Sequence, residues 1–315
     1  MSASNLPSNA KWQQMLAIVN QSTTTVLPDL NAQFRQLFFK RLLAENTLVF
    51  LLQYIGLVLC AFGTSETPVW LAAGTSCAFI FMRGPSVLPG IWFGTFCAYF
   101  FAHSGIALGL IAATAYALQA YFLLSLSYRF LSPTLIYYQQ LLLTKFFVLA
   151  SGITALMSLI LTVACYKSIL YPVWLYWWLA NLTGVLIFSF ALITLDAFFT
   201  QIDELKELNK ISLAFYILTI ITPLLVLISS PTPAITLSTS LLLLLNIILV
   251  SQRFGWCGCV ISVFCVGFGL DLAAFLQTPL FTTAFTFQTV TNIQLLLLLA
   301  TLVGLSLGIR KFSAS

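Results

Sequence analysis

The chain has 315 residues, of which 60% are hydrophobic and 7% are charged, and its mean hydropathy is +1.02. This composition excludes an ordinary soluble domain, in which about 45–50% of residues are apolar and about 25% are charged. The apolar runs are continuous rather than alternating, so they predict an all-α, polytopic membrane helix bundle and not a membrane β-barrel.

Residues 1–46 are polar and mixed and show no cleavable signal peptide, so we expect a cytoplasmic N-terminal segment. Apolar residues recur at helical spacing over 12–19 and 30–42, and basic residues interleave the second stretch. Such amphipathic helices are typical of an anchor lying along the inner leaflet, and a docking helix for a cytoplasmic partner is the alternative.

The membrane domain is expected at 47–311, followed by a short tail at 312–315. A hydrocarbon core of about 30 Å needs roughly 20 apolar residues per helix. Ten runs meet this need approximately, at 47–63, 68–82, 86–102, 105–128, 146–166, 173–195, 212–229, 234–250, 255–276 and 290–309.

Placing both termini in the cytoplasm leaves Lys167 as the one basic residue in an outer loop. Excess Lys and Arg in cytoplasmic loops is the usual rule, and it supports this orientation and the count of ten. The net charge of +5 is then explained by topology and by contact with anionic lipid, so we expect no nucleic-acid partner.

The letters PVWL occur at 68–71 and again at 172–175, each directly before a long apolar run. Proline suits the first turn of a helix, and tryptophan suits the headgroup boundary. We therefore expect both copies to mark points where a span enters the membrane from outside.

The second copy continues with Trp174, Trp177, Trp178 and Asn181 on one helical face, at offsets 0, 3, 4 and 7. An aromatic belt at the membrane boundary accounts for part of this pattern. Asn181 lies about 13 Å below Pro172 along a helix, where an amide facing lipid would be costly, so it should face the bundle interior and meet a polar partner.

Ionisable residues at membrane level are few, and charges inside a membrane are functional candidates by default. Asp271 is the strongest candidate for a buried role, because small and apolar residues surround it. We expect a ligand site in the outer half of the bundle, formed by Glu66, Trp70, His103, Trp174, Trp177, Trp178, Asn181 and Asp271.

Seven cysteines lie in or beside apolar runs without a CxxC pair, so neither disulfides nor a metal site is expected. No nucleotide-binding or catalytic motif occurs, and we predict no enzymatic activity, no catalytic residue and no cofactor. Small residues four apart predict helix packing, with a homodimer as the alternative to packing within one chain. They are Gly90, Gly94, Gly105, Gly109, Gly304 and Gly308.

Three stretches resemble the MASE1 family of bacterial membrane-embedded sensory domains. They are PVWLAAGTSCAFIFMRGPSVLPGIWFGTF at 68–96, WWLANLTGVLIF at 177–188, and the region from QRFG at 252–255 through TNIQLLLLLATLVGLSLG at 291–308. The resemblance implies signal transduction at the bacterial inner membrane. Family members usually carry a histidine kinase, diguanylate cyclase or related output module after the last helix.

This chain departs from the family in two ways. Ala180 and Asn181 stand where the family commonly has glycine and an acid, and only a few residues follow the last predicted span. We therefore expect a sensor that binds a small molecule or senses membrane state. It would signal, through residues 201–211, to a separate histidine kinase or cyclic-dinucleotide enzyme.

Two other functions stay open, a small-solute transporter and a structural subunit of a membrane complex. The transporter interpretation is less favoured because the sequence shows no evident pair of interrupted helices and few polar residues near the midplane.

Overall fold

The computed structural model describes residues 28–62, 68–102, 105–130, 139–168, 170–200, 233–276 and 287–314, with a few further positions between 221 and 229. The chain divides into two units, residues 1–45 and 46–315, and each is described by itself. In the first unit, the Arg41 guanidinium pairs with the Glu45 carboxylate one helical turn away, at 2.9 Å. All else described below belongs to the second unit.

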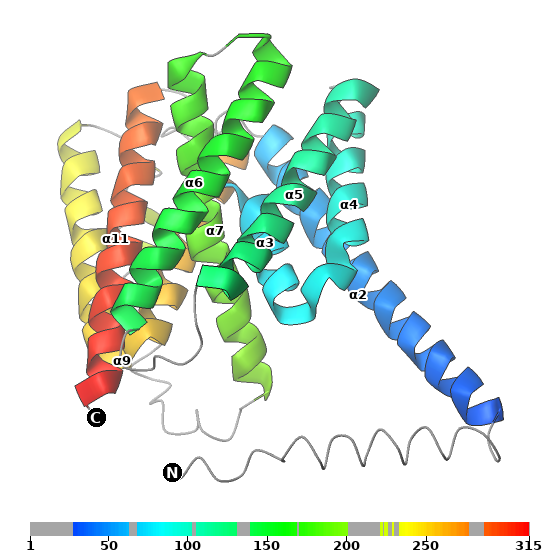
Figure 1. The fold of residues 1–315 in the computed structure, drawn as a ribbon. Helices are drawn as coiled ribbons and strands as arrows, with labels where there is room; N and C mark the ends of the chain where they lie inside the picture. Colours follow the sequence, from blue (N-terminus) through cyan, green and yellow to red (C-terminus); the bar gives the residue numbers. More distant parts are fainter. Residues whose placement is uncertain are drawn as a thin grey trace. The chain divides into compact units, whose positions relative to one another are not determined.

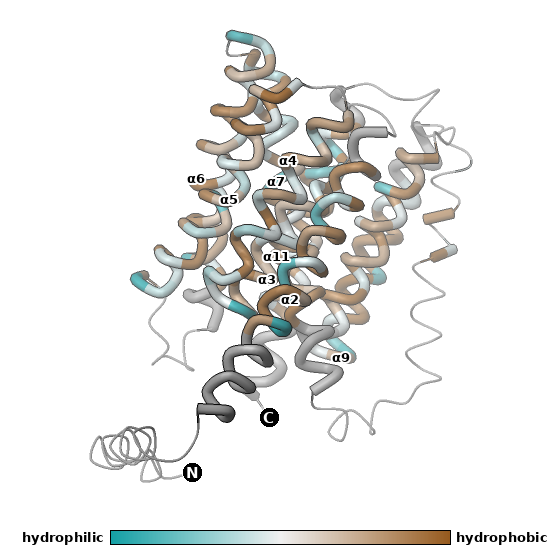
Figure 2. The backbone as a smooth tube through the Cα atoms, turned by 90° about the vertical axis from the view of Figure 1, so that its right-hand side faces the viewer, coloured by the Kyte–Doolittle hydropathy of each residue, from teal (hydrophilic) through white to brown (hydrophobic). Residues whose placement is uncertain are grey.

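The regular elements in the described ranges are all helical, which confirms the predicted fold class. Figure 2 shows apolar residues along most of the bundle helices and hydrophilic ones at several helix ends. In chain order the elements of Figure 1 are α2 (Pro28–Phe62), α3 (Leu71–Arg83), the 3-10 helix η1 (Gly84–Val87), α4 (Leu88–Phe101), α5 (Ile106–Phe130), α6 (Gln139–Tyr166), α7 (Tyr171–Thr200), α9 (Pro233–Phe275) and α11 (Phe287–Ala314).

Eight segments of the described chain are long and apolar enough to cross a membrane, so the protein is a multi-pass membrane protein. The predicted spans 68–82 and 86–102 fall in one such segment, Leu71–Phe101, which η1 divides. The predicted span 212–229 lies largely outside the described residues, as do the stretches 12–19 and 201–211. The count of ten spans and the cytoplasmic position of both termini stay predictions.

The chain reverses direction between α3 and α4 at Gly84, whose φ of 74° and ψ of −168° favour a residue without a side chain. The reversal brings Ser76 and Thr95 to the same residue of α2, Gln53. The Gln53 carboxamide donates to the Thr95 hydroxyl at 3.0 Å and accepts from the Ser76 hydroxyl at 2.9 Å. This buried amide therefore joins three helices, as polar residues commonly do within membranes.

Asn46, also on α2, holds the start of α4. Its carboxamide accepts a hydrogen bond from the Gly90 backbone N–H at 2.7 Å and donates to the Ser86 carbonyl at 2.9 Å. A Cβ on Gly90 would lie 2.6 Å from the Asn46 carbonyl oxygen, and a Cβ on Gly94 would lie 2.8 Å from that of Phe50. Both glycines thus allow α4 to approach α2 closely within one chain.

A second reversal divides α9 at Gly255, which has φ 69° and ψ −154°. A Cβ on Gly258 would lie 2.8 Å from the carbonyl oxygen of Val250. Eight residues of straight helix would separate such positions by about 12 Å, so the chain folds back on itself here. The two arms of α9 correspond to separate membrane segments, Ser238–Gly255 and Gly258–Phe275.

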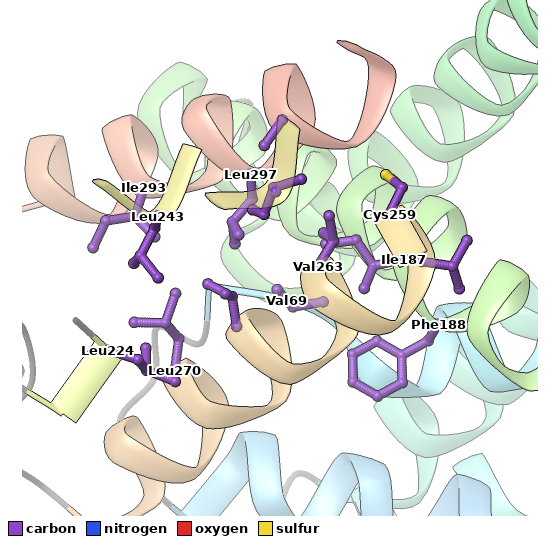
Figure 3. Close-up of a cluster of buried hydrophobic side chains, with 14 of the residues drawn as sticks. Val69, Ile187, Phe188, Leu224, Leu243, Cys259, Val263, Leu270, Ile293 and Leu297 are labelled. Carbon is purple, nitrogen blue, oxygen red and sulfur yellow. The ribbon is translucent and has the colours of Figure 1, made fainter. Parts of the chain in front are cut away.

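Helix α7 occupies the middle of the bundle and contacts α3, α6, α9 and α11 (Figure 1). Apolar residues of α7, α9 and α11 form one hydrophobic cluster, which also includes Val69 from the segment just before α3. Figure 3 shows Val69 among these side chains, with Val263 and Leu270 of α9 nearby. The residues that precede α3 are therefore part of the core of the bundle.

Candidate functional site

Residues 68–70, here called the α3 entry, are non-helical and lie inside the bundle. Pro68 and Val69 are buried, and Trp70 caps α3 with φ −94° and ψ 89°. The Trp70 backbone N–H donates to the carbonyl of Ala180 at 2.9 Å. Ala180 lies nine residues after the first residue of α7, about 14 Å along that helix, so the entry is deep in the bundle.

Helix α3 itself has 13 residues and is about 20 Å long, shorter than the hydrocarbon core of about 30 Å. Within a membrane, irregular backbone is tolerated only where protein buries it and satisfies its polar groups. The α3 entry meets this requirement through contacts with α7 and α9.

Two side chains bind the backbone of the entry. The Asp271 carboxylate, on α9, accepts a hydrogen bond from the Val69 N–H at 3.0 Å. The Thr183 hydroxyl, on α7, lies 3.4 Å from the Pro68 carbonyl, although its shorter bond goes to the carbonyl of Leu179 at 2.8 Å. A negative charge beside the N-terminal end of a helix is also favoured by the helix dipole.

Two glycines that the sequence interpretation missed make room for these contacts. A Cβ on Gly184 would overlap the carbonyl oxygen of Trp70, and a Cβ on Gly74 would overlap that of Gly184. Backbone therefore meets backbone where α3 crosses α7, as small residues permit in membrane bundles. Both glycines lie inside the sequence stretches that carry the family resemblance, and each has an alanine at a spacing of four, Ala78 after Gly74 and Ala180 before Gly184.

Three polar atoms near the α3 entry have no hydrogen-bond partner among the described residues. They are Oδ2 of Asp271, Nε1 of Trp70 and Oε1 of Gln294. Asp271 is only 2% exposed, which confirms its predicted burial, and Gln294 of α11 is fully buried. The Gln294 amide nitrogen lies 3.4 Å from the carbonyl of Tyr176, one turn before Ala180 on α7.

The tryptophans of the second PVWL region face α6. The indole N–H of Trp174 donates to the Ala155 carbonyl and that of Trp178 to the Ser151 carbonyl, each at 3.0 Å. The two indoles stack at 5.4 Å between ring centroids. Both indole N–H groups are therefore used in hydrogen bonds that hold α6 against α7. Trp177 is half-buried in the apolar cluster between these helices.

Asn181 faces the interior with 2% exposure and bonds the Ser158 hydroxyl of α6 at 3.0 Å, as predicted. Its amide also donates to the Trp177 carbonyl at 3.0 Å, while Oδ1 has no partner among the described residues. The predicted ligand residues thus fall into two groups. Trp174, Trp178 and Asn181 contact α6, whereas Trp70 and Asp271 belong to the α3 entry.

Glu66 and His103 lie outside the described residues. Of the remaining predicted packing glycines, Gly109 would place a Cβ 3.3 Å from the Phe96 ring, and Gly304 packs against Cys259 and Ser251. Gly105 is instead exposed at a turn, with φ 83° and no neighbour within 4 Å of a Cβ. Gly308 lies in α11, beyond the part of that helix whose packing is described.

The expectation for the first PVWL copy was wrong. This copy does not begin a span at the membrane boundary, because α3 starts only at Leu71 and Pro68 is buried outside any helix. The cause is that the partners that satisfy this backbone are distant in sequence. The expected lack of a pair of interrupted helices stays a prediction.

Comparison with protein families gives one match, in which the model of the MASE1 family covers residues 42–311. No curated protein gives a significant match. No solved structure gives one either.

Proposed function

Because the chain belongs to the MASE1 family of membrane-associated sensor domains, we propose that it receives its signal at the α3 entry and relays it through α7 to a separate cytoplasmic partner. The partner would be a histidine kinase or a cyclic-dinucleotide enzyme, and the site of action the bacterial inner membrane. The chain itself would carry no catalytic activity.

The observation that carries this proposal is the attachment of the α3 entry to α7. Ala180 and Thr183 bind its backbone, and Gly184 touches it directly. Any ligand that altered the entry would therefore act on α7. The same helix contacts α6, α9 and α11, so a shift of α7 would reach most of the bundle.

The length of α7 supports a relay. Its 30 residues span about 45 Å, whereas the hydrocarbon core is about 30 Å thick. The helix runs to Thr200, past Asp196, the one charged residue in its sequence. A rigid helix that leaves the membrane can carry a movement to a partner, as packed helices do in other switching proteins.

The residues proposed to meet the signal are Trp70 and Asp271, with Gln294 added by the structure. Each has a buried polar atom without a partner among the described residues. Glu66 and His103 stay in the proposed set. Such a ligand would have to bind two arrangements of the bundle with different affinity in order to shift the equilibrium between them.

The test is affinity purification of the full chain from native membranes in mild detergent. A stoichiometric histidine kinase or cyclic-dinucleotide enzyme in the eluate is the expected result. Its output activity should change when Asp271→Asn replaces the wild type but not with Gly152→Ala, a change on the exposed side of α6 where a Cβ meets nothing. Recovery of an unrelated assembly alone would favour a structural subunit.

A small-solute transporter is the second candidate, and the non-helical α3 entry is the observation that favours it. Transporters commonly bind substrate where helices are interrupted inside the membrane. Uptake by proteoliposomes across a panel of metabolites separates the two functions. A sensor gives no flux above that of empty liposomes, whereas saturable uptake would contradict the sensor proposal.

A further inference from the structure

The buried carboxylate of Asp271 needs a positive charge that the described residues do not supply. Only one of its oxygens has a partner, the Val69 N–H, and the other has none in the described part of the chain. An ionised carboxylate with a single hydrogen bond is very unfavourable in an apolar interior. Something must therefore neutralise it.

The elements packed around Asp271 offer no nearby cationic side chain in their described parts. Segment 68–70 and residues 287–307 of α11 contain no titratable group. Arg83 ends α3 about 18 Å beyond Leu71, and residues 256–271 of α9 put about 22 Å between Asp271 and the turn near Arg253.

The other titratable groups on these elements are hydroxyls, thiols and one carboxylic acid, none of which is a cation. Helix α7 contributes Tyr171, Tyr176 and Asp196, the last about 24 Å along the helix from Ala180. Helix α3 contributes Cys77, and α9 contributes Cys257, Cys259 and Cys265. Two other buried atoms of the bundle also lack a partner in the described residues, an acceptor, Oε1 of Gln294, and a donor, the indole N–H of Trp70. The described residues thus offer no cation to the Asp271 carboxylate.

We infer that Asp271 binds one monovalent cation, a proton or an alkali-metal ion, at its second oxygen, and that this occupancy sets how firmly the α3 entry is held. A single charge calls for a monovalent partner. No group of three or more His, Cys, Asp or Glu side chains that could hold a metal ion occurs among the described residues, so these residues do not supply the usual ligands of a divalent metal.

The cation would act through the bond to Val69. A carboxylate accepts a stronger hydrogen bond from a backbone N–H than a neutral acid does. Gain or loss of the cation therefore changes the hold of α9 on the entry, which is attached to α7 on its other side. This signalling role depends on the proposed function, but cation binding itself does not.

Thermal unfolding of the full chain in lipid nanodiscs tests the binding. A ligand that binds only the folded state raises Tm with its concentration, by about 2 to 4 °C for each tenfold rise. One series varies pH from about 5 to 9 at constant salt. The other replaces choline chloride with sodium or potassium chloride at constant pH and ionic strength.

We expect the wild type to gain stability either as pH falls or as one alkali ion increases, which identifies the cation. Asp271→Asn, which is permanently neutral and keeps an acceptor for Val69, should lose that dependence. Glu45→Gln is the matched control, because it also turns a carboxylate into an amide but at a pair outside the core, and it should behave as the wild type. Parallel responses in wild type and Asp271→Asn would overturn the inference.

Infrared spectroscopy provides a second measurement that needs no folded variant. In wild type labelled with ¹³C at the aspartate side-chain carboxyl, a bound proton gives an isotope-shifted carboxylic acid band at neutral pH. Absence of the band together with stabilisation by sodium or potassium assigns the alkali ion. If the carboxylic acid band and the stabilisation by sodium or potassium are both absent, cation binding is rejected. If the protein shows either signal but recruits no partner, only the proposed function is rejected.

Discussion

The two PVWL copies have the same four residues but opposite environments. At 172–175 the letters lie in the first turn of α7, where Tyr171 is 63% exposed and Trp174 binds the backbone of α6. At 68–70 the first three letters form a non-helical segment inside the bundle, whose N–H groups at Val69 and Trp70 bind Asp271 and Ala180, and only Leu71 is helical. Tertiary partners, and not local propensity, therefore decide whether this motif is helical.

The first copy differs most from the second in that its backbone contacts the backbone of α7, and Gly184→Ala tests this contact. The new Cβ would overlap the Trp70 carbonyl oxygen, a backbone atom that cannot turn aside. We expect a loss of about 3 kcal/mol in the free energy of unfolding, measured by thermal or detergent-induced unfolding.

Gly152→Ala is the matched control for this change. Gly152 is also helical, but a Cβ there meets nothing within 4 Å. Alanine is favoured over glycine in a helix by about 1 kcal/mol, so the control should be unchanged or slightly more stable. Equal destabilisation by both substitutions would show that the α3 entry does not lie against α7.

The two prolines should differ by a smaller amount. Pro68→Ala adds an N–H at a buried position, and we expect a cost of about 1–3 kcal/mol because a buried donor loses its hydrogen bonds to water. Pro172→Ala adds an N–H in the exposed first turn of α7, where such groups are unbonded in any helix. We expect Pro172→Ala to lower the free energy of unfolding by no more than about 1 kcal/mol, chiefly because alanine gives the unfolded chain more conformational freedom than proline does.

Comparison of Tm values for the two proline variants is the measurement. A larger loss for Pro172→Ala would place the second copy, rather than the first, in the interior.

The smallest effect is expected for the indole N–H groups. Trp174→Phe removes a hydrogen bond to the Ala155 carbonyl, whereas Trp70→Phe removes a buried N–H that has no partner among the described residues. Both changes leave a similar void, so their difference isolates the hydrogen bond. Trp174→Phe should be more destabilising by about 1 kcal/mol.

Unfolding of both variants in the same nanodiscs gives that difference directly. If Trp70→Phe proves the more costly change, the Trp70 indole has a partner that the described residues do not reveal.

Several features of the site could be predicted because their physical basis is local. Asn181 and Asp271 are polar residues in long apolar runs, and such residues face the interior of a bundle. By the same reasoning Gln53 and Gln294, both fully buried, could have been found. Gly74 and Gly184 could also have been found, because each has an alanine at the spacing of four that signals helix packing, Ala78 and Ala180 respectively.

The division of the predicted ligand residues into two groups was also beyond the sequence. Helical spacing correctly placed Trp174, Trp178 and Asn181 on one face of α7. Which neighbour that face meets depends on how the helices assemble, and it meets α6. The opposite face carries Ala180 and Thr183, and small side chains of this kind do not by themselves indicate a functional site.

Composition alone was sufficient to establish a multi-pass helical membrane protein, because a bilayer provides no partners for backbone groups and helices satisfy them internally. The non-helical segment before α3 could not be predicted from the sequence, because it depends on contacts that exist only in the folded bundle. Val69 and Asp271 are 202 positions apart, and Pro68 and Thr183 are 115 apart. A segment can leave the helical state inside a membrane only when such distant groups are brought to its backbone, and no local pattern of residues records that event.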